Sequence, residues 1–428
     1  QFRTLGVQVP RSASQNLAML AAQLVVLTAH VILQIAYAAG ADSIRGAHAA
    51  VFRDSTQVLP REPVASGELR VTVMGSGMPY TRRAQAAASF LVQLGDEAQS
   101  TFLFDLGSGS LANVNAAGVD YGRLNTVFLT HYHVDHTGDL PALFGAGMVM
   151  GRIHPLHLYG PSGPILEHGL EHLCQGLRAF TRWDIDSRMG RVPSGNADEL
   201  VCHEFDYRQI NQTVYAEGDV VVTSSPVVHA IDGPVAYRLT WRGRSFTFSG
   251  DTKPSSNMAE LAQGSDIFVH EAFVTPPVLA QAMSLDIADA RHIVEHIHTP
   301  LRAAGHIFSL AKPRLAVVYH LWLNYQDFTQ IVDEVRRTYS GPLAIADDLD
   351  VYETFDGGVR QRKQLLVDRP FPIPSRGAAP HAAPPRACEA GGGQGCPARQ
   401  PPSEPVKTDS GRRHGLSEFL LKTIVPVE

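Results

Sequence analysis

The chain has 428 residues, of which 44% are hydrophobic and 18% charged, and its formal net charge is −6. This composition excludes wholly disordered, collagen-like and multi-span membrane proteins, and the acidic balance disfavours general binding to nucleic acid, which needs a broad basic face. The four cysteines are too few for a disulfide scaffold. The 19 histidines stand out, because histidine is the commonest metal ligand and titrates near neutral pH.

Residues 1–41 have the layout of a secretory signal peptide. Arg3 and Arg11 precede a mainly apolar segment over 17–37, which ends in small residues around Ala38, and regions in this order are typical of export signals. An uncleaved membrane anchor and a buried amphipathic helix are the alternatives, since about 20 apolar residues can span a bilayer. We expect a periplasmic or secreted protein without a stable membrane span in its mature form, with N-terminal anchoring as the alternative.

Residues 42–67 are expected to form a connector, and from residue 69 the pattern changes to short apolar runs separated by Gly and Pro. Such runs are typical of strands and turns, and their mixture with helical patterns predicts an α/β protein of layered sheets with helices packed outside. The expected strands cover 69–74, 90–94, 101–104, 126–129, 156–159, 220–224, 236–241, 245–248, 267–269 and 315–318. The expected helices cover 279–282, 287–297, 302–311 and 327–339.

The C-terminal segment 364–428 is dense in Pro, Ala, Gly and Arg, above all between residues 369 and 405. Such a composition buries too little apolar surface to offset the entropy of ordering the chain, so we expect a disordered tail. Cys388 and Cys396 lie in this tail, where they either pair in a small loop or remain without a structural role.

The strongest chemical motif is HYHVDH at residues 131–136, which follows the expected strand over 126–129. Loops at strand ends commonly carry catalytic groups. Three imidazoles and one carboxylate within six residues are good zinc ligands, and a tight turn directs alternate side chains to two neighbouring metal positions. A solvated histidine-rich loop is the alternative without chemistry.

This loop resembles the H-x-H-x-D-H signature of the metallo-β-lactamase superfamily, and four later or earlier segments resemble that superfamily in the right order. These segments are FLFDLG at 102–107, VVH at 227–229, FSGDT at 248–252 and VVYH at 317–320. The resemblance covers roughly residues 68–363 and implies a single catalytic domain with the αββα sandwich fold.

The resemblance also implies a dinuclear site with two Zn²⁺ ions per chain. The ligands of the first ion would be His131, His133 and His229. The ligands of the second ion would be Asp135, His136 and His320. Asp251 would bridge both ions, Asp105 would orient the ligands from behind, and Asp135 also counts among the catalytic residues. An open position on the ions would supply metal-bound hydroxide, which attacks an electrophilic centre.

Further segments resemble the ribonuclease Z branch, namely GSG at 75–77, YGPSG at 159–163, HEA at 270–272 and HT at 298–299. In that branch the equivalents of Glu271 and His298 relay a proton to the leaving group, as a carboxylate and an imidazole can do together. A surface or helix-capping role is the alternative for His298. The chain departs from that branch between His229 and Asp251, where a long tRNA-binding arm is replaced by room for two strands and a turn.

Four segments are more similar to exported or uncharacterised bacterial hydrolases of this superfamily, of the guanitoxin-biosynthesis and chlorothalonil dehalogenase types. They are GSGMPYT at 75–81, EFDY at 204–207, HAIDGP at 229–234 and IADD at 345–348. This resemblance implies a small-molecule substrate, which is an ester, phosphodiester, sulfate ester or activated aryl halide, and it suggests a homodimer. A ribonuclease Z-like phosphodiesterase or endoribonuclease and a metal-binding module without turnover are the alternatives. No nucleic acid partner is expected.

Several side chains near the expected site have two interpretations each. Tyr132, Trp322 and Tyr325 flank ligand positions, and they either stack on a flat substrate or pack in the core. Arg82 and Arg83 follow the first turn, and they either hold an anionic substrate or remain exposed.

Overall fold

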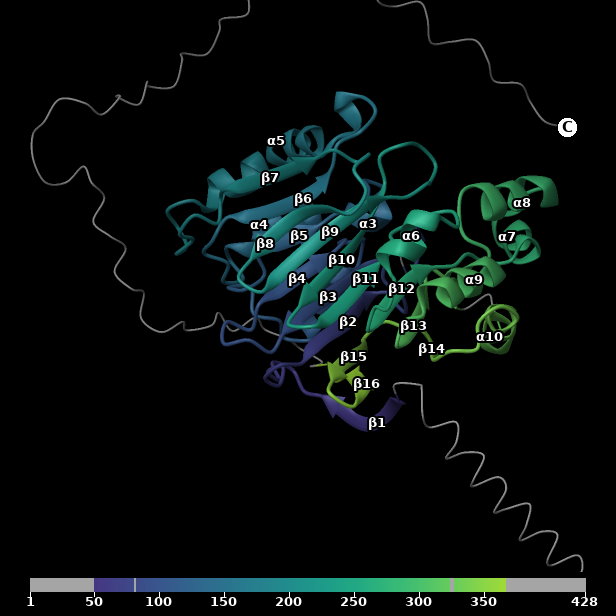
Figure 1. Ribbon diagram of the computed structural model, residues 1–428. Helices are drawn as coiled ribbons and strands as arrows, with labels where there is room; N and C mark the ends of the chain where they lie inside the picture. Colours follow the sequence, from purple (N-terminus) through teal and green to yellow (C-terminus); the bar gives the residue numbers. More distant parts are fainter. Residues whose placement is uncertain (1–49, 81, 324–326, 367–428) are drawn as a thin grey trace, which may run out of the picture. The chain divides into compact units, whose positions relative to one another are not determined.

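Two sheets carry the strands of the described residues, which are residues 50–80, 82–323 and 327–366 of a computed structural model (Figure 1). The nine-stranded sheet contains, in spatial order, β1 (Ala50–Val58), β16 (Gly358–Gln364), β15 (Asp350–Phe355), β2 (Leu69–Gly75), β3 (Ser89–Leu94), β4 (Thr101–Phe104), β5 (Thr126–Phe128), β6 (Leu156–Pro161) and β7 (Leu200–Phe205). The seven-stranded sheet contains β14 (Leu343–Ile345), β13 (Leu315–Tyr319), β12 (Ile267–Glu271), β11 (Arg244–Phe248), β10 (Val235–Trp241), β9 (Val220–Pro226) and β8 (Gln212–Glu217).

Helices lie between some of these strands along the described residues. They are α2 (Ser110–Ala116), α3 (Val134–Thr137), α4 (Leu140–Gly147), the short 3₁₀ helix η1 (Leu166–His168), α5 (Leu170–Arg188), α6 (Ser256–Leu261), α7 (Pro276–Met283), α8 (Ile287–His296), α9 (Leu301–Ala311) and α10 (Phe328–Arg336). Among the residues that the structure describes, no helix is both long enough and apolar enough to cross a bilayer.

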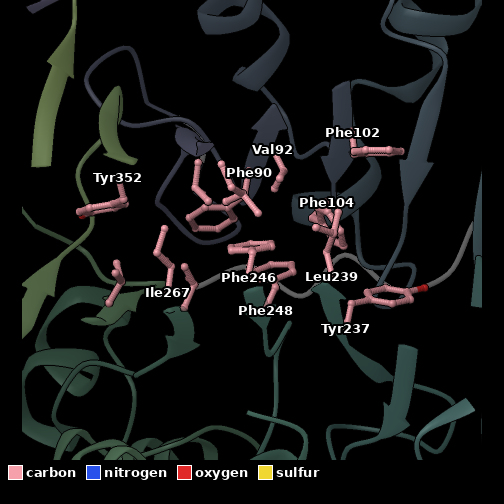
Figure 2. Packing of buried hydrophobic residues seen from close by; sticks show 14 of the residues in the cluster. Phe90, Val92, Phe102, Phe104, Tyr237, Leu239, Phe246, Phe248, Ile267 and Tyr352 are labelled. Carbon is pink, nitrogen blue, oxygen red and sulfur yellow. The ribbon is translucent and has the colours of Figure 1, made fainter. Parts of the chain in front are cut away.

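Aromatic and aliphatic side chains fill the space between the two sheets (Figure 2). Strand β3 shows the alternation that produces this layer, because Phe90 and Val92 face the other sheet while Leu91 faces the outer helices. The ring of Phe90 meets Phe248 of β11, with 5.0 Å between the ring centroids. Each large apolar side chain buried in this way stabilises the fold by about 1.5–3 kcal/mol.

Helices cover the outer face of each sheet (Figure 1). Leu143 of α4 and Leu177 of α5 pack with Leu158 of β6 on the nine-stranded sheet. On the seven-stranded sheet, Phe308 of α9 packs against Phe268 of β12 at a centroid distance of 5.3 Å, and α6 and α10 join the same cluster. The order helix, sheet, sheet, helix confirms the predicted α/β class and the αββα sandwich.

The expected connector over 42–67 contains a strand. Residues 50–58 form β1, which pairs with β16 in parallel at one edge of the nine-stranded sheet. The sequence patterns did not predict β1, because its side chains are mostly exposed and polar. Its partner strand, at Gly358–Gln364, also lies some 300 positions away in the chain. The folded region therefore starts earlier than residue 68.

Each strand expected from the sequence is present with similar bounds, and so are the four expected helices. Helices α2 to α6 and strands β1, β7, β8 and β14 to β16 lie outside those expectations. A disulfide that the sequence did not predict joins Cys174 of α5 to Cys202 of β7. The expected export signal at residues 1–41, Tyr325, and the tail beyond residue 366 with Cys388 and Cys396 lie outside the described residues.

Candidate metal centre

The ends of parallel strands bring the chemical groups to one edge of the sandwich. Strands β4 and β5 are parallel, and so are β11, β12 and β13; β9 runs in the direction of β11 because both are antiparallel to β10. Asp105 follows β4, the 131–136 loop follows β5, and His229, Asp251 and His320 follow β9, β11 and β13. Ligand sites commonly form where the carboxyl ends of strands meet.

The first group of side chains that the structure brings together contains His131, His133, His229 and Asp251, with one ligand atom of each within 4.8 Å of the others. His133 Nδ1 lies 3.1 Å from His131 Nε2 and 3.4 Å from His229 Nε2. Asp251 Oδ2 lies 3.8 Å from His229 Nε2 and 4.0 Å from His131 Nε2. His133 is exposed, whereas the other three side chains are buried.

The second group shares Asp251 with the first and adds Asp135, His136 and His320, all buried. His136 Nε2 lies 3.2 Å from Asp251 Oδ1 and 3.5 Å from Asp135 Oδ2. His320 Nε2 lies 3.2 Å from Asp251 Oδ2 and 3.4 Å from Asp135 Oδ2. One carboxylate, that of Asp251, therefore faces both groups.

These separations fit metal coordination. A tetrahedral zinc ion with nitrogen ligands at about 2.0–2.1 Å places its ligands about 3.3 Å apart. The separations given above are 3.1–4.0 Å in the first group and 3.2–3.5 Å in the second. Neutral imidazole and carboxylate are also the ligand types that suit zinc. The donor set of each group thus matches the ion that the motifs predict.

Hydrogen bonds orient two of the imidazoles so that Nε2 faces the centre. His136 Nδ1 donates to Asp105 Oδ2 at 2.6 Å, and His229 Nδ1 donates to the carbonyl of Ile297 at 3.0 Å. Asp105 is itself held by Thr130, whose backbone N–H and hydroxyl donate to its two oxygens at 2.8 Å and 2.7 Å. Such partners fix the imidazole tautomer and ring orientation in metal sites.

The electrostatics of the centre favour a cation. Burial lowers the pKa of His131 well below its usual value and the pKa of His229 to about 4, so both imidazoles are neutral at pH 7. Burial acts in the same direction on His136, but the carboxylates of Asp251 and Asp135 raise the pKa of His136 well above its usual value. Without metal, a proton on His136 neutralises part of the negative charge that metal ions would otherwise balance.

The backbone is strained at the centre. Asp105 and His320 have φ values of +57° and +68°, a left-handed conformation that is uncommon outside glycine. Gly250, next to Asp251, has φ of +57°, and a Cβ atom added there would lie 2.6 Å from Cβ of Thr130. The FSGDT segment therefore needs glycine at this position so that Asp251 can approach the loop after β5.

His298 and Glu271 form a buried pair beside the first group. His298 Nδ1 donates to Glu271 Oε1 at 3.1 Å, and the His298 ring stacks on Phe273 at a centroid distance of 3.9 Å. Backbone N–H groups of Thr252 and Thr299 donate to the two oxygens of Glu271 at 2.6 Å and 3.3 Å. Ligand atoms of this pair, His229 and Asp251 all lie within 4.8 Å of one another, so His298 is not a surface or capping residue.

The aromatic and basic residues predicted near the site differ in their placement. Tyr132 packs against the cluster under α5, and its hydroxyl donates to the carbonyl of Pro161, which favours core packing. Trp322 is buried and meets the half-exposed ring of Tyr80 edge-on at 5.2 Å. Arg82 donates to Gln85, and Arg83 is exposed.

Three hydrogen bonds around the centre were not predicted from the sequence. Thr130 holds Asp105, the carbonyl of Ile297 orients His229, and the hydroxyl of Tyr319 donates to Asp251 Oδ1 at 3.5 Å. Thr130 and Tyr319 stand directly beside ligands in the chain, so their proximity was visible but their hydrogen bonds were not. Ile297 lies on an element far from β9 in sequence, and nothing in the sequence pairs the two.

Comparisons with known proteins identify the family of this fold. The family model described as "Metallo-beta-lactamase superfamily" matches residues 82–278. Ribonuclease Z from Mycobacterium avium (strain 104) is 31% identical over 244 residues, which cover 55% of this chain and 82% of that relative. The chain belongs to the metallo-β-lactamase superfamily. It is a metal-dependent hydrolase, as its motifs predict.

Two further matches are similar to this chain, one in sequence and one in fold. Ribonuclease Z from Bacillus cereus (strain AH820) is 24% identical over 311 residues, which cover 64% of this chain and 96% of that relative. The metallo-beta-lactamase fold protein YhfI from Bacillus subtilis has the same fold, with a TM-score of 0.51 and 21% identity over 67% of this chain and 100% of that one. Members of the superfamily typically bind zinc, and the two groups of side chains provide ligands for metal ions.

One expectation from the sequence conflicts with these relatives. No nucleic acid partner was expected, whereas the relatives that match over most of their length are named ribonuclease Z. The acidic net charge does not decide this point, because it averages over the whole chain and says nothing about the surface around the candidate metal centre. The narrower subgroup expected from segments such as 204–207 and 345–348 stays a prediction.

Proposed function

We propose that this chain is a ribonuclease Z-like phosphodiesterase that holds two zinc ions and hydrolyses phosphodiester bonds in RNA. The observation that carries the proposal is the carboxylate of Asp251, which faces both ligand groups while the His298–Glu271 pair lies beside them. The ribonuclease Z relatives support RNA as the substrate class. When bound, two zinc ions would lower the pKa of a water molecule and neutralise charge that develops on the phosphate.

The chain's own residues would manage the protons of this reaction. In phosphodiester hydrolysis, the oxygen of water bonds to phosphorus, the bond to the leaving oxygen breaks, and that oxygen must take up a proton. His298 is placed to give this proton, because its Nδ1–H is engaged by Glu271 and its Nε2 remains available. Asp135, held between His136 and His320, is the acceptor for a hydrogen bond from the attacking water.

Glu271 would orient His298 and would not contact the substrate. Burial lowers the pKa of His298, which disfavours the protonated imidazole that an acid requires. The carboxylates of Asp251 and Asp135 oppose that effect, and Glu271 Oε1, 3.1 Å away, fixes the proton on Nδ1 of His298. Burial, together with the nearby Asp251, raises the pKa of Glu271 well above its usual value.

A second candidate is the hydrolysis of small esters, sulfate esters or activated aryl halides. The observation in its favour is the segment between His229 and Asp251, where only β10, β11 and their short turn are present. In the ribonuclease Z branch that this chain resembles, the corresponding segment holds a long tRNA-binding arm. A phosphodiesterase without this arm would act on a shorter RNA or a smaller diester.

A substrate panel separates these candidates. The zinc-loaded chain would be assayed on bis(p-nitrophenyl) phosphate, end-labelled single-stranded RNA and precursor tRNA, and in parallel on carboxylic esters, sulfate esters and haloaromatics. We expect cleavage of phosphodiesters that Asp251→Asn abolishes. Turnover of esters or haloaromatics together with intact RNA and intact diester would favour the second candidate and contradict the first.

We also propose that the chain works in an oxidising compartment. The apolar N-terminal segment suggests export, and the Cys174–Cys202 disulfide supports it, because disulfides are rare in proteins of the reducing cytosol. Peptide mapping of unreduced protein from periplasmic and cytosolic fractions tests this proposal. We expect processed chain with a linked Cys174–Cys202 peptide in the periplasm, and full-length cytosolic chain with two free thiols would contradict it.

A further inference from the structure

The IADD segment at 345–348 contributes no ligand to the metal centre, yet it ends in a half-buried carboxylate with four donors. Asp348 Oδ1 accepts from the backbone N–H and the hydroxyl of Ser76 at 2.9 Å and 2.8 Å. Asp348 Oδ2 accepts from the backbone N–H of Ala86 at 2.7 Å and from Asn113 Nδ2 at 3.0 Å. A carboxylate has about four acceptor positions, so Asp348 is fully engaged as a joint between three segments of the chain.

The loop that Asp348 holds is hydrogen-bonded to the backbone of a candidate metal ligand. The carbonyl of Ser76, the residue held by Asp348, accepts a hydrogen bond from the backbone N–H of His320 at 2.9 Å. The amide of Gln85 donates to the Ser76 hydroxyl at 3.1 Å and to the carbonyl of Leu321 at 2.9 Å. The backbone on both sides of the His320 side chain is thus attached to the loop that Asp348 holds.

His320 depends on this attachment more than His136, the other histidine of its group, does. His136 is oriented by Asp105 through Nδ1, whereas no group among the described residues accepts a hydrogen bond from His320 Nδ1. Its backbone has φ of +68°, a conformation that persists only where surrounding contacts impose it. The rings of Phe273 and His298 pack beside the His320 imidazole, and the Ser76 loop holds the backbone from which that imidazole projects.

We propose that Asp348 is a positioning residue for the second ligand group, Asp135, His136, Asp251 and His320. It acts through Ser76 on the backbone of His320 and touches neither metal nor substrate. The proposal rests on the proposed function, because it requires that this group binds a metal ion. Partners that orient metal ligands typically change metal affinity about 10–100-fold when they are removed.

A metal titration tests the role without relying on turnover. Apo protein would be titrated with Co²⁺ while its visible absorption is recorded, and the two binding steps would be fitted separately. In Asp348→Asn, an amide N–H₂ group replaces one carboxylate oxygen and cannot accept the hydrogen bonds that this oxygen accepts. We therefore expect one of the two Co²⁺-binding steps to weaken at least tenfold. The other step, which belongs to His131, His133 and His229, should keep its wild-type affinity. Asp347→Asn is the matched control, since Asp347 is exposed and pairs with Lys363 at 2.9 Å.

Ser76→Ala is the second variant, because it removes one of the four donors and leaves the backbone contacts in place. We expect the same step to weaken by a smaller factor, with a circular dichroism spectrum like that of the wild type. Wild-type affinity for both ions in Asp348→Asn and Ser76→Ala would overturn the proposal, and so would equal weakening of both steps. A wild-type chain that takes up no Co²⁺ would instead contradict the proposed function on which this role rests.

Discussion

His136 Nδ1 lies 2.6 Å from Asp105 Oδ2, although 31 positions separate the two residues in the chain. Both side chains are completely buried, and Thr130 holds the carboxylate from the other side. The end of β4 thus determines the tautomer and direction of an imidazole in the loop after β5. The HYHVDH motif therefore depends on Asp105, a residue outside the motif, for the orientation of one of its candidate metal ligands.

Replacement of Asp105 tests this contact. In Asp105→Asn the side chain keeps its size, but it loses the charge that holds the His136 tautomer, and we expect zinc affinity at the Asp135, His136 and His320 group to fall about 10–100-fold. Competition with a zinc chelator measures the change. Asp139→Asn is the control, because Asp139 accepts from Leu111 N at 2.9 Å and contacts no ligand. Unchanged affinity in Asp105→Asn would show that packing alone orients His136.

Gly250→Ala tests the strain beside Asp251. An alanine there has the unfavourable φ of +57° and a Cβ atom 2.6 Å from Cβ of Thr130. We expect the free energy of unfolding to fall by about 1–3 kcal/mol, with loss of metal because Thr130 and Asp251 move apart. Urea unfolding and metal analysis check both effects. Gly243→Ala is the control, because Gly243 also has a positive φ but an added Cβ atom would have no neighbour within 4 Å. This variant should be less stable and should still retain metal. Metal loss to the same degree in both variants would contradict a local effect.

His298→Ala tests the proposed acid. We expect kcat on a diester with an alkoxide leaving group to fall about 10²–10⁴-fold, while cleavage of bis(p-nitrophenyl) phosphate changes little, because p-nitrophenolate leaves without a proton. Metal content should stay unchanged. His296→Ala is the control, since His296 is exposed on α8 two positions away. Equal losses on both substrates would assign His298 to substrate binding or folding instead of proton donation.

The Cys174–Cys202 disulfide closes a loop with a sequence separation of 28 residues. A cross-link of this kind typically stabilises a protein by about 2–4 kcal/mol, chiefly through the unfolded chain. We therefore expect the double variant Cys174→Ser, Cys202→Ser to unfold at lower urea concentration by that free energy. Addition of a reductant should shift the wild type toward the variant and leave the variant unchanged. A wild type insensitive to reductant would indicate that the thiols are free.

Sequence patterns predicted the features of this fold that are local. The strand at 126–129 and the HYHVDH loop lie next to each other, and the later ligands His229, Asp251 and His320 each stand within a few residues of the end of a strand. Because parallel strands end at one edge, ordered strand ends suffice to bring ligands together. The prediction of the sandwich and of the two ligand groups rested on the resemblance to the metallo-β-lactamase superfamily, and the geometry of the strand ends agrees with it.

Contacts between distant segments were not predictable in this way. β1 pairs with β16 across almost the whole described chain, and Cys174 meets Cys202 only because α5 packs beside β7. The role of Tyr132 was open in the sequence, since its position beside two ligands is compatible with substrate contact; its hydroxyl instead contacts Pro161. Such outcomes depend on packing in three dimensions, which residue spacing does not encode.

The most direct test of the account is the zinc content of the purified chain and of Asp251→Asn, measured by plasma mass spectrometry after dialysis against metal-free buffer. Asp251 is the side chain that both ligand groups share. The proposed dinuclear site requires two zinc ions per wild-type chain and the loss of at least one in Asp251→Asn, with the fold retained by circular dichroism. A wild-type chain without bound metal, or a variant that still holds two ions, would contradict it.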